Sequence, residues 1–277
     1  MKTNALAIVL LFAAQAASAA VQYEFHQTSH SDIDQNAPAE LVGRATIDGE
    51  RSRVDFLGGD AYPPDTYVIS TDGSRTLTFV DPVRKSFTQF NTANLAAAIG
   101  STKIEVSNLT SNVEKLDDQQ IVAGIPTNHY RLTLNYDMSV TFGSMPLRQT
   151  VRTVIDKWTT VSFGDVNEMF LASSGVHTGN PKVDELIELE ATKIKGLPLK
   201  QTVVVTTTNN KRAAGSQLPV VASRSSRREM TITNIRETPV DGSTFAVPVS
   251  YRKADPLQKE AAAQTQVQVL SMEPKAQ

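Results

Sequence analysis

Near the start of the chain, the residues whose chemistry could bind a metal share one sequence parity. They are His26, His30, Asp32 and Asp34. Residues of one parity lie on one face of an extended strand, and imidazoles with carboxylates are typical zinc ligands. The apolar Tyr23 and Phe25 have the opposite parity, which puts this group on the solvent side, and residues 31–37 have loop composition. No nearby residue suggests the second shell that a metal site needs. The pattern therefore favours a solvated strand end, and we expect no metal.

The usual motifs of enzymatic catalysis are missing from the sequence. It has no G-x-S-x-G elbow, no cysteine, no H-E-x-x-H pair, no phosphate-binding glycine loop and no dinucleotide fingerprint. His129 and His177 are isolated in sequence, Asp117-Asp118 is typical of a turn, and the single tryptophan, Trp158, is expected to pack in a core or at a rim. We therefore expect no enzymatic activity and no cofactor.

The clearest structural signal is residues 130–142, where every even position is apolar and every odd position is polar. Seven apolar residues at a period of two predict a β-strand with one buried and one wet face. The strand would be about 43 Å long at 3.3 Å per residue. A strand of that length, wet on one side, has to twist and bend. It therefore predicts a large curved antiparallel sheet with a covered or ligand-holding inner face.

Short alternating segments separated by turn residues run along most of the chain. The expected strands before residue 100 are 21–26, 41–47, 51–56, 67–70, 76–80 and 85–90, with turns at Asp48-Gly49, Asp72-Gly73 and Asp81-Pro82. Longer strands are expected at 103–116, 119–125, 130–142, 147–160, 199–208 and 228–237, with turns at Asp117-Asp118 and Pro126-Thr127. Arg224, Arg227 and Arg228 are interpreted as a solvated turn between strands, with a docking patch for an acidic partner as the alternative.

Two helices interrupt the strands. A short one is expected from Asn91 or Thr92 to Ile99. The clearer one, Lys182–Lys195, has Asn180 as a cap, Pro181 in its first turn and Gly196 as its stop. Its apolar stripe is Val183, Leu186, Ile187 and Ile194, so we expect this helix to cover a core or a cavity rim.

The two ends of the chain differ from the middle in composition. Residues 1–19 are typical of a signal peptide with an Ala17-Ser18-Ala19 cleavage site, which predicts a periplasmic or secreted protein beginning at Ala20. No other apolar run approaches the roughly 20 residues of a transmembrane helix. Residues 20–251 are expected to form a single domain, and residues 252–277 a flexible tail. The formal net charge of −2 gives no support for nucleic-acid binding, and without cysteine the core alone has to stabilise the fold.

Several segments in the C-terminal half resemble a known family. They are Gly196-Leu197-Pro198 entering a strand, Thr231-Ile232-Thr233-Asn234-Ile235, Phe245-Ala246-Val247-Pro248 and Tyr251. This half is similar to exported bacterial proteins of the LolA/LolB-like fold, the outer-membrane lipoprotein carriers. The resemblance implies an α+β, mostly β domain whose curved antiparallel sheet forms an incompletely closed barrel around a short helical lid that can hold acyl chains. The motif residues are strand and turn residues, so no ligand-contacting residue is transferred.

Two functions follow as expectations. The first is a periplasmic, non-enzymatic binding protein or carrier for a lipid or a lipoprotein acyl chain, with these residues in the cavity wall or lid: Tyr130, Leu132, Leu134, Tyr136, Phe142, Leu186 and Ile187. The alternative is an envelope protein that docks other proteins and whose barrel is filled by its own side chains. Bulk on the inner face separates the two, and Phe79, Phe87 and the aromatic residues of 130–142 are the candidates to fill it.

Overall fold

The computed structural model of this chain describes residues 19–32, 39–91, 103–142, 145–163, 185, 193–209 and 223–254. Within these ranges nearly every segment is β-strand or turn. The strands are β1 (Ala19–Ser31), β2 (Ala39–Asp48), β3 (Arg51–Gly59), β4 (Tyr67–Ser70), β5 (Thr76–Asp81), β6 (Ser86–Asn91), β7 (Lys103–Val122), β8 (Ile125–Phe142), β9 (Met145–Thr160), β10 (Leu197–Asn209), β11 (Ser223–Pro239) and β12 (Arg252–Lys253).

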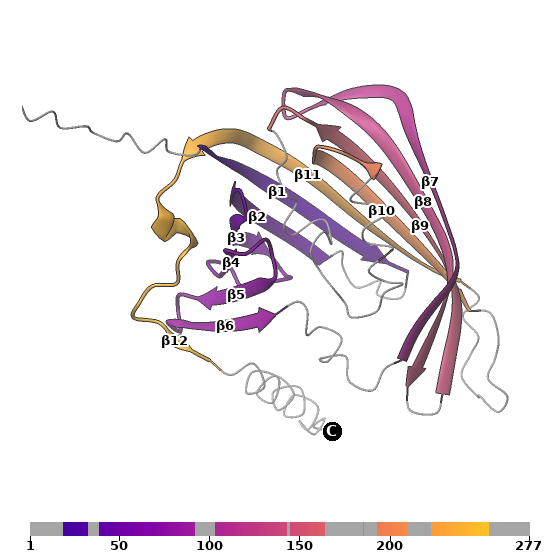
Figure 1. Ribbon diagram of the computed structural model, residues 1–277, viewed down its shortest axis with the longest axis horizontal. Coiled ribbons are helices and arrows are strands. Elements are labelled where there is room, and N and C mark those ends of the chain that lie inside the picture. Colours follow the sequence, from indigo (N-terminus) through magenta and orange to yellow (C-terminus); the bar gives the residue numbers. More distant parts are fainter. Residues whose placement is uncertain are drawn as a thin grey trace, which may run out of the picture.

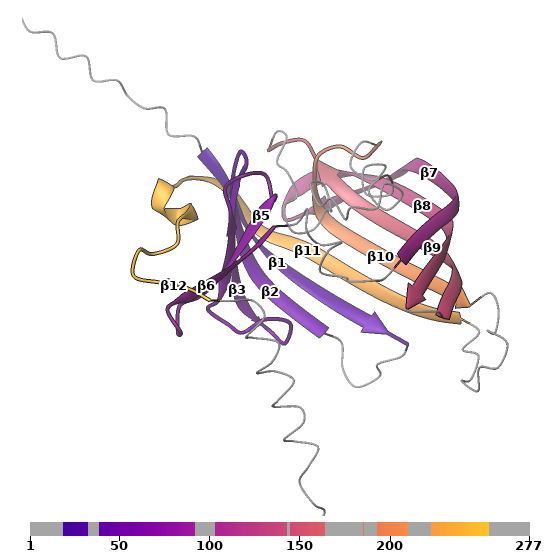
Figure 2. The ribbon, with the colours of Figure 1, turned by 60° about the horizontal axis from the view of Figure 1, so that its bottom comes forward.

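All twelve strands of the described chain belong to one sheet, in the order β12-β6-β5-β4-β3-β2-β1-β11-β10-β9-β8-β7. Neighbours are antiparallel, except that β12 runs parallel to β6. The sheet bends strongly, so that β2–β6 and β7–β10 form two walls joined through β1 and β11 (Figures 1 and 2). Its edge strands, β12 and β7, are not paired with each other. The expected mostly-β, curved and incompletely closed sheet is therefore confirmed.

The pairing of β1 with β11 makes this a single sheet rather than two. It joins the first strand of the chain to its last long strand and places Phe25 opposite Ile232. Both side chains are buried in one core cluster with Tyr23, Val54 and Phe56. Because the side chains of a strand alternate between faces, this core fixes which parity of each neighbouring strand points inward.

The predicted alternation of buried and exposed side chains is observed over residues 131–135, and residues 136–141 are all half-buried. Leu132 and Leu134 are 0% and 5% exposed, whereas Arg131 and Asn135 on either side of this pair are exposed. The strand is longer than expected, because β8 begins at Ile125. It lies between β7 and β9, so both of its edges are hydrogen-bonded.

Two predicted turns around β7 are wrong. Residues 103–116 and 119–125 are not separate strands, because Asp117-Asp118 lies at an irregularity inside the continuous β7. The predicted turn at Pro126-Thr127 lies inside β8, where Pro126 pairs with Ile121. The chain reverses instead at Ala123 and Gly124, whose φ angles of 51° and 79° are those of the two-residue hairpin turn with both central residues left-handed.

The wall formed by β3–β6 is covered on both faces. On its outer face Tyr67, Ile69 and Val80 pack with Phe87, Val247 and Tyr251. The segment that carries Val247 and Tyr251 begins at a short 3-10 helix, η2 (Gly242–Phe245), and leads into β12. The sequence suggested that Phe87 fills the inner face. This prediction is wrong, because Phe87 packs in the cluster on the outer face. The paired strand β12 also lies beyond the expected domain boundary at residue 251.

The expected helical lid is not confirmed. Of the predicted helix 182–195, the structure describes only Glu185 and Lys193–Lys195, and Leu186 and Ile187 lie outside the described residues, as does the predicted short helix up to Ile99. Glu185 and Lys193 have helical geometry. Ile194 is 7% exposed and packs against the inner face of β8–β10.

Candidate functional site

The inner face of β7–β10 carries a continuous row of aliphatic side chains. Leu132 and Leu134 of β8 form one buried cluster with Ile155 of β9, Val203 of β10 and Ile194, and Val113, Tyr130, Tyr136 and Val205 pack against it. The strand register places Val113, Leu132, Ile155 and Val203 directly opposite one another across four strands. We call this cluster the aliphatic wall. β-Branched residues on neighbouring strands pack in this way on a pleated, half-buried surface.

The structure brings together four of the seven residues that the sequence placed in the wall or lid. Leu132 and Leu134 lie in the buried part of the aliphatic wall, and Tyr130 and Tyr136 lie at its partly buried margin. Burial raises the pKa of Tyr136, against a hydrogen bond with Thr153 that lowers it. Phe142 ends β8, but its side chain is not among those described.

The opposite wall of the sheet is filled with aromatic rings instead. Tyr62 stacks on Phe56 with ring centroids 4.2 Å apart, and Phe79 lies 6.4 Å from Tyr62. Phe25 closes on Gly43, where even a Cβ would meet its ring at 2.4 Å. Among the described residues, the large aromatic side chains of the inner face therefore lie mainly on β1–β5. The aliphatic wall on β7–β10 is the part of the inner face with smaller side chains.

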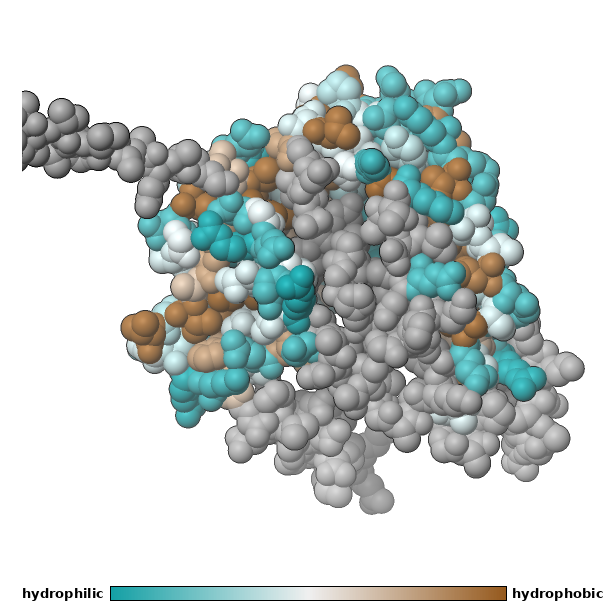
Figure 3. All heavy atoms as spheres, viewed as in Figure 1, coloured by the Kyte–Doolittle hydropathy of each residue, from teal (hydrophilic) through white to brown (hydrophobic). Residues whose placement is uncertain are grey.

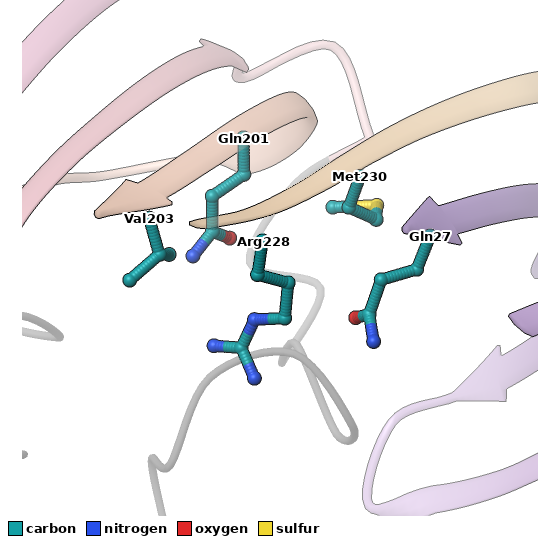
Figure 4. A pocket seen from close by; sticks show the side chains of 5 residues that line it. All are labelled: Gln27, Gln201, Val203, Arg228 and Met230. Carbon is teal, nitrogen blue, oxygen red and sulfur yellow. The ribbon is translucent and has the colours of Figure 1, made fainter. Parts of the chain in front are cut away.

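A small polar pocket lies where the aliphatic wall meets β11 and β1. It is lined by Gln27, Gln201, Val203, Arg228 and Met230, whose side chains leave three neighbouring strands on the same side (Figure 4). Its empty volume is about 190 Å³, including space open to solvent. The hollow is small and open to solvent, so it suits a chemical group rather than a complete enclosed molecule.

The pocket residues were missed by the sequence interpretation. Arg224, Arg227 and Arg228 are not in a turn, because all three lie in β11. Arg227 faces outward and forms an ion pair with Glu229, whereas Arg228 shares the parity of the buried Met230 and Ile232. The sequence did contain a signal for this position. Side chains of a strand alternate between faces, so Arg228 lies on the same face as Ile232, which is four residues further along the strand.

His129 is not isolated, but its surroundings are structural. Its ring nitrogens lie 2.6 Å from Asp118 and 3.0 Å from Asp156, and its ring stacks on Trp158 at 4.1 Å. Arg131 also donates hydrogen bonds to Asp156. In the described part of the chain both polar partners of the imidazole are carboxylates, so His129 has no hydroxyl nucleophile to activate. The arrangement attaches the irregular part of β7 to β8 and β9.

This attachment makes stability depend on the charge of Asp118. Its hydrogen bond to His129 holds the pKa of Asp118 below the ordinary value of 3.8. A depressed carboxyl pKa contributes stability above the unfolded value, and that stability is lost as the pH falls through the folded value. We expect Asp118→Asn to be less stable than the parent chain near about pH 7, with the difference closing in acid below about pH 4. Urea unfolding across this pH range measures it, with Asp117→Asn as the neighbouring control. A difference that stays constant down to about pH 3 would contradict the role given to Asp118.

Two of the N-terminal histidines and aspartates have partners within the protein. His26 pairs with Glu40 on β2, and Asp32 accepts a hydrogen bond from the Ser225 backbone N–H at 2.9 Å. Asp34 lies outside the described residues. Nowhere in the described ranges do three or more His, Cys, Asp or Glu side chains gather closely enough to hold an ion.

On the face seen in Figure 3, hydrophobic residues of the described strands form small separate groups among hydrophilic ones. None of the helical residues that the structure describes belongs to a helix long and apolar enough to cross a membrane.

Comparisons with known proteins add little to this description. No protein-family model and no curated protein sequence matches the chain. Among solved structures, a LolA superfamily protein from Nitrosomonas europaea matches over 83% of this chain and 90% of that chain, with a TM-score of 0.32 and 8% sequence identity. Similarity at this level assigns neither a family nor a function.

Proposed function

We propose that this chain is an exported, non-enzymatic binding protein or carrier for the acyl chain of a lipid or lipoprotein. The observation that carries the proposal is the division of the inner face: aromatic rings fill the β1–β5 side, while the β7–β10 side is an aliphatic wall. An apolar chain laid along the partly buried members of that wall, Val113, Tyr130, Tyr136 and Val205, would remove apolar surface from water, which is favourable by about 25 cal/mol per Å². The span from β7 to β10 is about 14 Å at the usual strand spacing, the scale of a medium-length acyl chain.

The lid belongs to this proposal as well. The helix 182–195 is proposed to lie over the aliphatic wall, and two contacts of its C-terminal end support that position. Ile194 packs into the wall, and the Lys193 ammonium group donates a hydrogen bond to the Ser111 hydroxyl of β7 at 3.0 Å. Residues 1–19 are proposed to be removed on export, which leaves Ala20, a buried residue of β1, as the first residue.

Protein docking is the second candidate, and the free edge of β7 favours it. β7 spans 20 residues and has a paired neighbour on one side only. An exposed strand edge can accept a strand from another protein. However, β7 carries charged side chains such as Glu114 and Lys115 and is interrupted at two register shifts. Charges and bulges are the features by which proteins prevent edge pairing, so we favour the acyl-binding function.

Uptake of a fluorescent fatty acid by the exported protein, whose N-terminal sequence should begin at Ala20, tests the proposal. We expect the parent protein to take up the probe and Tyr136→Lys to lower its affinity at least about tenfold, because the change puts a charge beside the apolar path. Tyr136 is only partly buried, so a flexible lysine can reach water and the fold should survive. Asn135→Lys, one residue away on the exposed outer face, is the matched control and should bind like the parent.

Two results of the same experiment would contradict the proposed acyl binding to the aliphatic wall. A parent protein that takes up no acyl probe and carries no co-purified lipid in native mass spectrometry excludes the carrier function and leaves docking through β7. Equal affinities of Tyr136→Lys, Asn135→Lys and the parent would show that the probe binds somewhere other than the aliphatic wall.

A further inference from the structure

The pocket at the end of the aliphatic wall contains a buried acceptor without a partner. Gln201 is 5% exposed, and its side-chain oxygen Oε1 has no hydrogen-bond partner in the described part of the chain. Leaving a buried polar group unsatisfied costs about 1–3 kcal/mol, so proteins rarely keep one without a reason. The orphan oxygen can be satisfied by a ligand that donates a hydrogen bond.

A free cation lies in the same pocket. Arg228 is exposed, and within the described ranges no side chain forms a hydrogen bond or an ion pair with its guanidinium. Three arginines on the outer face are paired instead: Arg227 with Glu229, Arg131 with Asp156 and Arg44 with Glu24. A guanidinium presents several donors in a fixed plane that match carboxylate and phosphate oxygens. Arg228 is therefore suited to an anionic group that comes from outside the described chain.

The position of the pocket connects these polar groups to the acyl path. Arg228 lies directly opposite Val203 in the pairing of β10 with β11, and Val203 belongs to the aliphatic wall. Gln201 lies opposite Met230, and Met230 lies opposite Gln27, so the polar groups come from adjacent strands (Figure 4). The row of side chains across the strands is thus apolar from Val113 to Val203 and ends at the cation Arg228. This order complements a single-chain amphiphile, which has an apolar chain and an anionic end.

We propose that this pocket binds the head group of an acidic lipid, with Arg228 on the anion and Gln201 Oε1 accepting a hydrogen bond from a hydroxyl of the same head group. The inference rests on the proposed acyl-binding function and specifies its ligand class. The acyl chain lies along the aliphatic wall, and the head group lies at the solvent-open pocket against Arg228 and Gln201. Gln27 supplies a further amide in the lining.

Two single-chain lipids of equal acyl length separate head-group binding from chain binding. Both lipids carry a phosphate and a glycerol-backbone hydroxyl. Lysophosphatidylglycerol has a net negative charge and additional head-group hydroxyl donors, whereas in lysophosphatidylcholine a trimethylammonium group, which is no hydroxyl donor, neutralises the phosphate charge. Binding is measured by titration calorimetry below the micelle concentration. We expect the parent protein to bind the glycerol lipid about tenfold more tightly, because one charge-assisted hydrogen bond is of that magnitude. Arg228→Gln should remove this preference, because it weakens binding of the net anionic glycerol lipid more than binding of the net neutral choline lipid.

Two further variants complete the test. Gln201→Leu removes the orphan acceptor and should reduce the preference for the glycerol lipid, while Arg227→Gln, on the outer face of the same strand, should bind both lipids like the parent. If the parent binds both lipids equally, or if Arg228→Gln keeps the preference, the head-group inference is overturned and acyl binding stands. If neither lipid binds, the proposed function itself fails, and the head-group inference fails with it.

Discussion

Leu132→Asp is expected to unfold the domain or to leave it barely stable. Leu132 is 0% exposed at the centre of the aliphatic wall, between strands β7 and β9, so a carboxylate there is removed from water and packed among aliphatic side chains. The change removes buried aliphatic volume, which alone costs about 2–5 kcal/mol, and adds the cost of burying a charge. Together these losses approach the whole free energy of unfolding of an ordinary domain, about 5–15 kcal/mol.

The matched control is Asn135→Asp, three residues further along β8 on the exposed outer face. This variant adds the same charge to the same strand and should change the free energy of unfolding by less than about 0.5 kcal/mol. Urea unfolding followed by the fluorescence of Trp158, the single tryptophan, measures both variants. Comparable losses of stability in the two variants would show that β8 is not anchored by its inner face.

The architecture of the sheet could be predicted because it depends on local periodicity. The alternation in residues 130–142 identified a strand, its buried parity and its unusual length, and β4 was predicted with its observed bounds, Tyr67–Ser70. Pairing order was not predictable in this way. The contact of β1 with β11 joins residues 195 to 220 positions apart, from Ser31 with Ser226 to Ala19 with Pro239, and it depends on which apolar faces are complementary in three dimensions.

The wrong turns have a common physical cause. Asp117-Asp118 and Pro126-Thr127 have turn composition, yet tertiary contacts decide their conformation. Asp118 is held by His129, and Pro126 sits at the second position of β8, where the sheet tolerates a residue without an N–H. The true reversal uses Ala123 at a positive φ, which alanine rarely adopts, so its sequence signal was weak.

The candidate site was half predictable for a related reason. The apolar residues of the wall can be identified in the sequence because they recur at every second position. A functional polar residue on the inner face interrupts this alternation, so the alternation does not locate it. Arg228 and Gln201 have the parity of buried residues and the chemistry of surface residues. Composition placed Arg228 in a solvated turn among serines, and only the register with Val203 shows that it continues the aliphatic row. Departures from a binary pattern of this kind are expected at functional sites.

Gly196→Ala is expected to destabilise the protein by about 3 kcal/mol. Gly196 has a φ of +93°, and a Cβ there would lie 2.5 Å from the backbone oxygen of Thr160. A non-glycine residue in this conformation costs about 1–3 kcal/mol, and a clash with backbone adds to the cost because it cannot be relieved by rotating a side chain. The sequence assigned Gly196 to a helix stop. The structure gives it a second role, as the point where the chain passes close to the end of β9 before entering β10 at Leu197.

The consequence extends to the aliphatic wall, because Ile194 packs into the wall only two residues before Gly196. Gly58→Ala is the control: its φ is not in the left-handed region, and its Cβ would meet only Val42 at an ordinary 3.9 Å. We expect this control to change stability by less than about 1 kcal/mol. If acyl binding depends on the position of Ile194, Gly196→Ala should also weaken uptake of the fatty-acid probe at protein concentrations where the variant is still folded. Equal losses of stability in the two alanine variants would show that the close approach to Thr160 does not constrain this connection.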